Sequence, residues 1–277
     1  MKRTIYETFS RASKTYFYSS IFFEGQTKDD VFTLYAFVRK ADDYVDTIPQ
    51  KKGEFYKLKN DYRNALHGQP SSNEIIDSFV ELVQRRRLKP DWVDAFLWSM
   101  ESDLVKSTYH TIEELKKYLY GSAEVVGLMM AKILNLPPAS YPAARYLGRS
   151  MQYINFIRDI QEDIALGRTY LPKAEQETHG LASLRYEHAV NHPVEYEDFI
   201  HSQIKRYFSW QRKAENGFSY IPKRFFIPIK TASDMYKWTA QQIDQNPYIV
   251  YNRKIKPSIP RIVLHAICNL VTISISS

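Results

Sequence analysis

The sequence predicts an all-α protein, and three observations carry this prediction. Apolar residues recur at helical spacing through most of the 277 residues. No segment shows the sustained alternation of apolar and polar residues that a half-buried strand requires. Glycines and prolines divide the chain into pieces of helix length, with breaks at Gly25-Gln26, Pro49, Gly68–Ser72, Pro90, Pro137-Pro138, Pro172, His192-Pro193, Pro222 and Pro247. Because no low-complexity linker or solenoid repeat interrupts this pattern, we expect one domain over residues 1–277.

Four helices can be assigned from their own residues. The segment Thr27–Asp30 is typical of a capped helix start and leads into a long apolar run. A second helix is expected to open at Thr111, which is followed by two glutamates, and to continue through Lys132. A third should span Ala139 to Leu166. The stretch from Ile262 to Ile275 is rich in β-branched residues; we expect a helix docked on the core, with a membrane-surface contact as the alternative.

Two acidic clusters lie within the first and third of these helices. Asp42 and Asp46 are four apart, as are Asp159 and Asp163, so each pair shares one helix face. Two carboxylates on one buried face repel each other, and burying them uncompensated costs free energy. Mg²⁺ relieves this conflict because it binds one or two carboxylates, keeps several waters and completes its shell with substrate phosphate oxygens. Asn155 precedes Asp159 by one turn and is placed to add a neutral oxygen ligand.

Acid pairs at helical spacing also occur on solvated helix faces, and either cluster alone fits that reading equally well. Three features favour a metal site. Apolar residues flank both clusters, in 31–38 and in 153–157; basic residues stand beside the acids; and the arrangement occurs in opposite halves of the chain. Asp43 and Glu162 point away from the two stripes and are expected to have supporting roles at most.

At these residues the chain resembles the squalene/phytoene synthases, which join prenyl diphosphates head to head, and among them most of all the phytoene synthases. Several ordered motifs carry the resemblance: Asp42 to Asp46 within Tyr35–Asp46, Gln152 to Asp163 followed by Gly167–Pro172, the aromatic and small segment Tyr118–Met130, and Ser13–Phe17 near the start. One departure is Glu124, where many members have glycine.

The resemblance implies an isoprenoid-synthase-type helical bundle around a central cavity, with Mg²⁺ or Mn²⁺ as the cofactor. It implies that the catalytic residues are Asp42, Asp46, Tyr120, Asp159 and Asp163, and that Asn155 joins the four aspartates as a metal ligand. The residues that it places at the substrate are Ser13, Lys14, Thr15, Arg39, Gln152, Asn155, Arg158, Tyr236 and Arg253.

Each assignment has an ordinary structural alternative. Arg39 is also spaced for an intrahelical salt bridge to Asp43, and Tyr120 is equally well explained as a buried aromatic. The small residues between 121 and 127 would thin a wall for a prenyl chain or allow close helix packing. The two readings of these small residues do not exclude each other.

Charge and composition limit the partners. The net charge of +7 permits nucleic acid, anionic membrane or diphosphate. Nucleic acid is not expected, because the sequence has no helix-turn-helix, metal finger or basic-aromatic RNA motif, and we interpret Arg85–Arg87 as the solvated end of a helix. Zinc is not expected, because the seven histidines show no close ligand pair. The 21 tyrosines, 15 phenylalanines and 4 tryptophans suit a water-free pocket for a carbocation.

The compartment is expected to be the cytoplasm, with a peripheral membrane contact left open. The single cysteine, Cys268, precludes an intramolecular disulfide, which fits a reducing compartment. No apolar run has the form of a signal peptide or the length of a membrane span. The sequence leaves the oligomeric state undetermined.

The implied reaction is the condensation of two geranylgeranyl diphosphates, through a cyclopropyl diphosphate, to phytoene in carotenoid biosynthesis. NADPH is not expected, because the chain has no glycine-rich dinucleotide fingerprint. The alternative is a squalene or dehydrosqualene synthase that uses farnesyl diphosphate. A non-catalytic relative that acts as an assembly factor would be expected to have lost acids from one cluster, and here both are complete.

Overall fold

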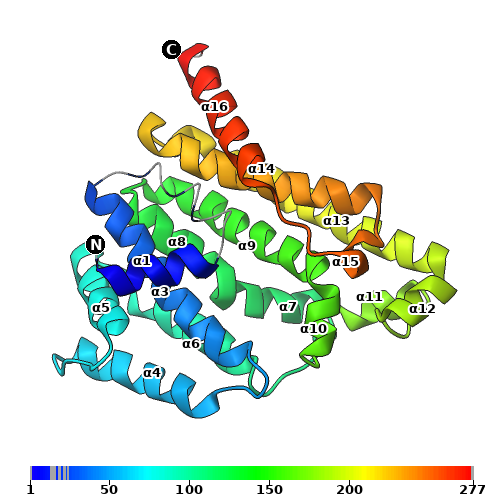
Figure 1. Ribbon diagram of the computed structural model, residues 1–277, viewed down its shortest axis with the longest axis horizontal. Coiled ribbons are helices and arrows are strands. Elements are labelled where there is room, and N and C mark those ends of the chain that lie inside the picture. Colours follow the sequence, from blue (N-terminus) through cyan, green and yellow to red (C-terminus); the bar gives the residue numbers. More distant parts are fainter. Residues whose placement is uncertain (1, 13–16, 18–19, 21–22, 24, 276–277) are drawn as a thin grey trace.

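The computed structural model is a bundle of helices around a central cavity (Figure 1). It describes residues 2–12, 17, 20, 23 and 25–275. The helices of the first half are α1 (Arg3–Ala12), α3 (Gly25–Val45), α4 (Lys52–Leu66), α5 (Glu74–Arg86), α6 (Pro90–Ser102), α7 (Ile112–Leu119) and α8 (Val125–Ile133). Those of the second half are α9 (Tyr141–Arg158), α10 (Ile160–Ala165), α11 (Lys173–Thr178), α12 (Tyr186–Asn191), α13 (Pro193–Glu215), α14 (Lys223–Gln245), α15 (Ile249–Asn252) and α16 (Ile259–Ile275).

The prediction of an all-α fold is confirmed. Within the described residues, extended pairing is limited to a single parallel bridge between Thr108 and Thr169. Helices α6 and α13 begin at predicted breaks, each at a proline, because a proline in the first turn removes no intrahelical hydrogen bond. The predicted cap at Thr111 is also confirmed, since its side chain accepts a hydrogen bond from the Glu114 amide at 3.2 Å. The predicted start near Thr27 is wrong: α3 begins two residues earlier, at Gly25.

Two helices that the sequence predicts as continuous are interrupted. A π-helical turn, Tyr120–Glu124, separates α7 from α8. Asp159, with φ −100° and ψ 19°, separates α9 from α10. Helical hydrogen bonds still cross this second break, from the Asp159 amide to the Asn155 carbonyl and from the Asp163 amide to the Asp159 carbonyl, both at 2.8 Å. The acidic stripe therefore continues across the break.

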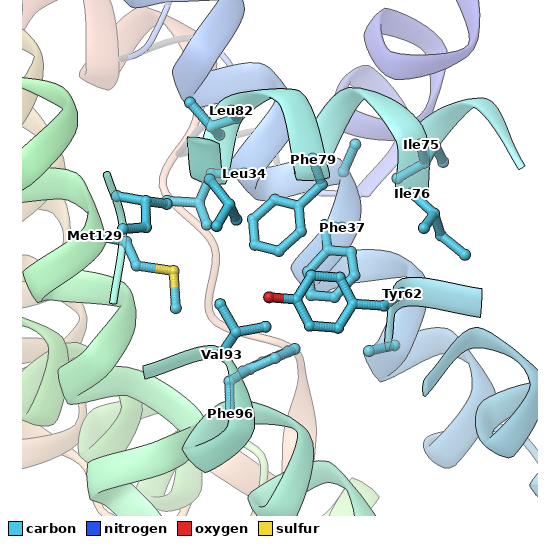
Figure 2. Close-up of a cluster of buried hydrophobic side chains, with 14 of the residues drawn as sticks. Leu34, Phe37, Tyr62, Ile75, Ile76, Phe79, Leu82, Val93, Phe96 and Met129 are labelled. Carbon is cyan, nitrogen blue, oxygen red and sulfur yellow. The ribbon is translucent and has the colours of Figure 1, made fainter. Parts of the chain in front are cut away.

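Buried apolar side chains form two clusters. The first gathers α3, α4, α5, α6 and α8, and Figure 2 shows its aromatic centre, where Phe37 stacks on Phe79 with ring centroids 3.8 Å apart. The second gathers α7, α9, α13 and α14 and contains the fully buried Tyr153, Tyr196 and Tyr207. Residues of α3, α8, α9 and α14 line the central cavity, so both clusters support its walls.

Glycines let the π-helical turn and α8 pack directly against α9. A Cβ at Gly127 would lie 2.2 Å from the Ala144 carbonyl oxygen, and one at Gly148 would lie 2.3 Å from that of Ala123. The close-packing interpretation of the small residues is therefore confirmed. Gly127, Gly148 and Ala123 also line the cavity, so the same contact forms part of its wall.

Two fully buried carboxylates are each held by two arginines. Arg85 Nη2 and Arg86 Nε both donate to Asp30 at 2.5 Å. The prediction that this arginine run ends a helix is confirmed, and Arg85 and Arg87 are exposed, but Arg85 and Arg86 also pair with the buried Asp30 near the start of α3. On the other side of the cavity, Glu124 accepts from Arg145 Nε at 2.7 Å and from Arg149 Nε at 2.6 Å.

Three further expectations can be compared with the structure. The prediction that α16 docks on the core is confirmed, since it packs along α14 with Ile262 and Ala266 buried. In the part of the chain that the structure describes, no helix is both long and apolar enough to cross a bilayer. His188 in α12 and His192 just after it stack with ring centroids 4.1 Å apart, but among the described residues no group of three metal-ligating side chains gathers around them.

Candidate active site

A cavity of about 730 Å³ runs through the middle of the bundle. One end is polar and contains all four aspartates that the sequence singles out, Asp42, Asp46, Asp159 and Asp163. The remaining wall is largely apolar, and its aromatic members are Phe9, Phe23, Tyr35, Tyr118, Phe156, Tyr170, Phe218 and Tyr236.

The first acid pair lies at the end of α3. Asp42 is in the last turn of this helix, and the Asp46 amide donates to the Asp42 carbonyl at 2.9 Å. Asp46 is 43% exposed and accepts a hydrogen bond from Arg168 Nη1 at 2.8 Å. Burial, and then the nearby charge of Asp46, raise the pKa of Asp42 well above its usual value.

The second pair lies where α9 meets α10. Arg158 grips the Asp159 carboxylate with two hydrogen bonds of 2.7 and 2.5 Å, and Lys254 Nζ lies 3.6 Å from it. Although burial alone would raise the pKa of Asp159, Arg158 and Lys254 lower it. Burial, and then the charges of Asp159 and Asp46, raise the pKa of Asp163 to about 8. The charge of Asp46 contributes to the pKa of Asp163, so the two acid pairs lie close together and face each other at the polar end of the cavity.

A fifth carboxylate, which the sequence analysis missed, lies behind the pairs. Asp103 is buried and accepts hydrogen bonds from the hydroxyls of Tyr118 and Tyr170, at 2.6 and 2.7 Å. Burial, opposed by the charge of Arg168, raises its pKa to about 6. No acid stands four residues from Asp103, so the sequence carried no pairing signal for it.

Arg168 links the main chain of Asp103 to the first acid pair. Its guanidinium is almost completely buried and donates to the Asp46 carboxylate, the Val45 and Asp103 carbonyls and the Tyr170 hydroxyl. Arg168 belongs to the segment that resembles the family's second motif, which was the available signal for it. The arrangement fixes the loop that carries Asp46.

The donor set fits a hard divalent cation. In the described ranges, no three carboxylate, imidazole or thiol groups gather into a ready cage. Mg²⁺ needs no such cage, since it takes one or two carboxylates and completes its shell with water and phosphate oxygens. Asn155 Oδ1 is buried without a hydrogen-bond partner among the described residues. A buried oxygen with no partner is available to coordinate a metal ion. The raised pKa values of Asp42 and Asp163 indicate uncompensated negative charge beside it.

The remaining predicted residues fall into three groups. Gln152 and Tyr236 line the cavity, and Gln152 Oε1 accepts from Asn155 Nδ2 at 3.4 Å. Arg39 lines it too, but pairs with Asp43 at 2.7 Å, so the intrahelical alternative is confirmed. Ser13, Lys14 and Thr15 lie outside the described residues.

Two of the predicted residues lie outside the lining of the cavity. Tyr120 does not line the cavity; its ring lies 5.3 Å from the Arg145 guanidinium. Tyr118, two residues earlier in α7, lines the cavity. Arg253 borders a small adjoining pocket of about 90 Å³, whereas Lys254 and Lys256 line the cavity itself.

Comparisons with known proteins identify the family. The squalene/phytoene synthase family model matches residues 9–262. The chloroplastic phytoene synthase of Daucus carota is 27% identical over 90% of this chain, which spans 64% of that relative's length. The 15-cis-phytoene synthase of Pantoea ananas is 26% identical over 86% of this chain and 81% of the relative.

Solved structures resemble the chain in fold. A ligand-bound dehydrosqualene synthase superposes with a TM-score of 0.85 at 20% identity, covering 98% of this chain and 95% of that one. The squalene synthase HpnC of Alicyclobacillus acidocaldarius gives a TM-score of 0.78 at 22% identity, covering 89% and 95%. At these identities the likeness establishes the arrangement of helices alone.

Proposed function

The chain belongs to the squalene/phytoene synthase family, and we propose that it joins two geranylgeranyl diphosphates head to head to form phytoene. The observation that carries the proposal is the cavity itself. One end holds two facing acid pairs with arginine and lysine beside them, and the rest is a long apolar wall. A diphosphate fits the polar end and a prenyl chain fits the apolar remainder.

The polar end is suited to hold and release diphosphate. Mg²⁺ would neutralise the negative charge of the departing diphosphate. The residues that would hold it are Asp42, Asp46, Asn155, Asp159 and Asp163. Lys254 and Lys256 line the same region and can hold diphosphate oxygens by charge-assisted hydrogen bonds. Arg158 is already oriented there by its two bonds to Asp159.

The apolar wall is suited to protect an allylic cation. Loss of one diphosphate leaves a cation, which the double bond of the second donor attacks, and loss of a proton to the released diphosphate then closes the ring of a cyclopropyl diphosphate. Loss of the second diphosphate then permits rearrangement to the linear product. Aromatic faces attract cations, and a dry wall excludes the water that would capture them. The bonds from Tyr118 and Tyr170 to Asp103 hold two of these rings at the polar end.

Donor length and cofactor use are the finer parts of the proposal. The curated relatives named above are phytoene synthases, which supports geranylgeranyl diphosphate as the donor and no use of NADPH. The second candidate is a farnesyl diphosphate enzyme that makes squalene or dehydrosqualene, which the names of the solved neighbours support. We propose that the enzyme works in the cytoplasm and meets its lipid substrate at a membrane.

A competition between the two donors tests the proposal. The enzyme receives equal amounts of geranylgeranyl and farnesyl diphosphate with Mg²⁺, with and without NADPH, and the products are quantified. The C20 donor should be preferred, because each buried CH₂ contributes about 0.8 kcal/mol and the longer donor buries five more carbons. Excess chelator should abolish turnover, and Mg²⁺ or Mn²⁺ should restore it. A preference for farnesyl diphosphate, or a reduced C30 product that needs NADPH, would move the enzyme to the squalene branch.

A further inference from the structure

Helix α16 has two different faces, and the first is fixed on the protein. Ile262 and Ala266 are buried against α14. Asn269 Nδ2 donates to Thr231 Oγ1 at 3.2 Å and to an oxygen of Asp234 at 3.1 Å. These contacts set the rotation of α16 about its axis, so its outward face is defined.

The outward face of α16 is apolar and open. Ile259, Val263, Leu264 and Ile267 are 36%, 44%, 59% and 52% exposed. Their spacing of three and four residues places them in one stripe along the helix. In Figure 1, α16 extends away from the other helices, so this stripe borders solvent at an extremity of the molecule. Isolated exposed apolar residues are ordinary, but a contiguous stripe indicates a contact surface.

Only positive charge accompanies the stripe in the sequence. From residue 245 to 277 the chain contains no aspartate or glutamate, and its four charged residues are the exposed Arg253, Lys254, Lys256 and Arg261. Lys254 and Lys256 line the cavity, and the chain reaches α16 only three residues after Lys256. Lys254 is paired with the carboxylates of Glu162 and, at 3.6 Å, Asp159, so Arg253, Lys256 and Arg261 supply most of the positive charge of the rim that leads from the cavity into the apolar helix.

We propose that α16 and this rim, together called the α16 surface, seat the protein on an anionic lipid bilayer. A helix with one apolar face lies in the interface of a bilayer, and adjacent lysines and arginines attract anionic headgroups. The charge pattern argues against a second copy as the occupant, because two such surfaces would place positive charges against each other.

The inference rests on the proposed function in one respect. A prenyl diphosphate has an apolar tail and a charged head, so it partitions to the same interface. Seating the α16 surface would hold the basic rim at the depth of the donor's diphosphate. Vesicle binding itself is measured without turnover, so its failure and the failure of the proposed function can be told apart.

Vesicle co-sedimentation tests the proposal. The full chain is mixed with phosphatidylcholine vesicles, with or without phosphatidylglycerol, and the bound fraction is measured. The test variant carries Leu264→Asn and Ile267→Asn, and the matched control carries Val190→Asn and Val194→Asn, which replace exposed apolar residues elsewhere. We expect the intact chain to bind anionic vesicles at least about tenfold better than neutral ones, and the test variant to lose about tenfold, since two half-exposed aliphatic side chains no longer enter the bilayer.

Circular dichroism and light scattering complete the test. The test variant should keep the helical spectrum, and the control variant should bind like the intact chain. Equal binding of the test variant and the intact chain would overturn the proposal, as would no binding to anionic vesicles. A dimer of the intact chain that the test variant abolishes, without vesicle binding, would identify a second copy as the occupant and would also overturn it. A chain that binds vesicles but turns over neither donor would contradict the proposed function alone.

Discussion

The molecule buries carboxylates in two ways, and the contrast separates structure from chemistry. In the walls of the bundle, Asp30 and Glu124 are fully buried and each is held by two arginines. At the polar end of the cavity, the side chains of Asp42 and Asp163 form no ion pair among the described residues, and their pKa values are raised. A buried acid with two arginines has its charge already compensated. A buried acid among other acids is stable only with a proton or a cation, which is the condition of a metal ligand.

The largest expected effect comes from two adjacent aspartates on α3. Asp42→Asn removes charge from the polar end and should lower turnover by at least about 10³-fold, because metal ions stabilise transition-state charge by several kcal/mol. Asp43→Asn changes a residue that pairs with Arg39 outside the cavity lining and should change turnover by less than about threefold. Steady-state rates with saturating Mg²⁺ and circular dichroism measure both variants. Similar turnover rates for the Asp42 and Asp43 variants would contradict the prediction, because they would mean that lining the cavity does not distinguish a catalytic acid from its neighbour.

The next effect concerns the compensated acids. Glu124→Ala leaves Arg149, which is 14% exposed, without its carboxylate and should lower the free energy of unfolding by about 3 kcal/mol. Arg145→Ala should cost about 1 kcal/mol, because Arg145 is 44% exposed and Arg149 still pairs with Glu124. Urea denaturation of metal-free protein measures both values. A larger loss from Arg145→Ala than from Glu124→Ala would show that the carboxylate is not the centre of this cluster.

The smallest effect is a difference in pH dependence. The pKa of Asp163 is about 8 in the folded protein and 3.8 in the unfolded chain, so between these values the folded state holds a proton that the unfolded state has lost. The stability of metal-free protein should therefore fall as pH rises toward 8. Asp163→Asn removes this contribution and should reduce the loss between pH 6 and pH 8 by about 1 kcal/mol, an amount discounted for partial exposure. Urea midpoints in excess chelator provide the measurement, and identical losses in both proteins would contradict the assignment.

Local periodicity predicted what depends on neighbours in the sequence. The helix start at Thr111, the helix breaks at prolines and the shared faces of the two aspartate pairs all follow from residues within a few positions of each other. Spacing within each helix does not determine how the helices pack against each other. The expectation that the two aspartate pairs meet therefore came from the family resemblance.

Long-range pairing was not visible in the sequence. Arg168 reaches Asp46 across 122 positions, and Arg85 reaches Asp30 across 55. Nothing local indicates that an arginine at an exposed helix end also pairs with a buried carboxylate, so the contacts of Arg85 and Arg86 with Asp30 were not predicted. Tyr118 and Tyr120 are both aromatic and lie on different faces of the helix, and the sequence does not show which face packs toward the cavity.

The glycine contact between α8 and α9 limits how this enzyme can change. At Gly127 and Gly148 the cavity wall is main chain, with a carbonyl oxygen directly behind it. Such a wall has no side chain to shorten, so no substitution there can enlarge the space, and every substitution would push the two helices apart. Variation in donor length would therefore be expected where side chains line the cavity, for example at Leu34 and Val38 of α3. Selection for longer or shorter products would be expected to act on α3 and to leave these two glycines unchanged.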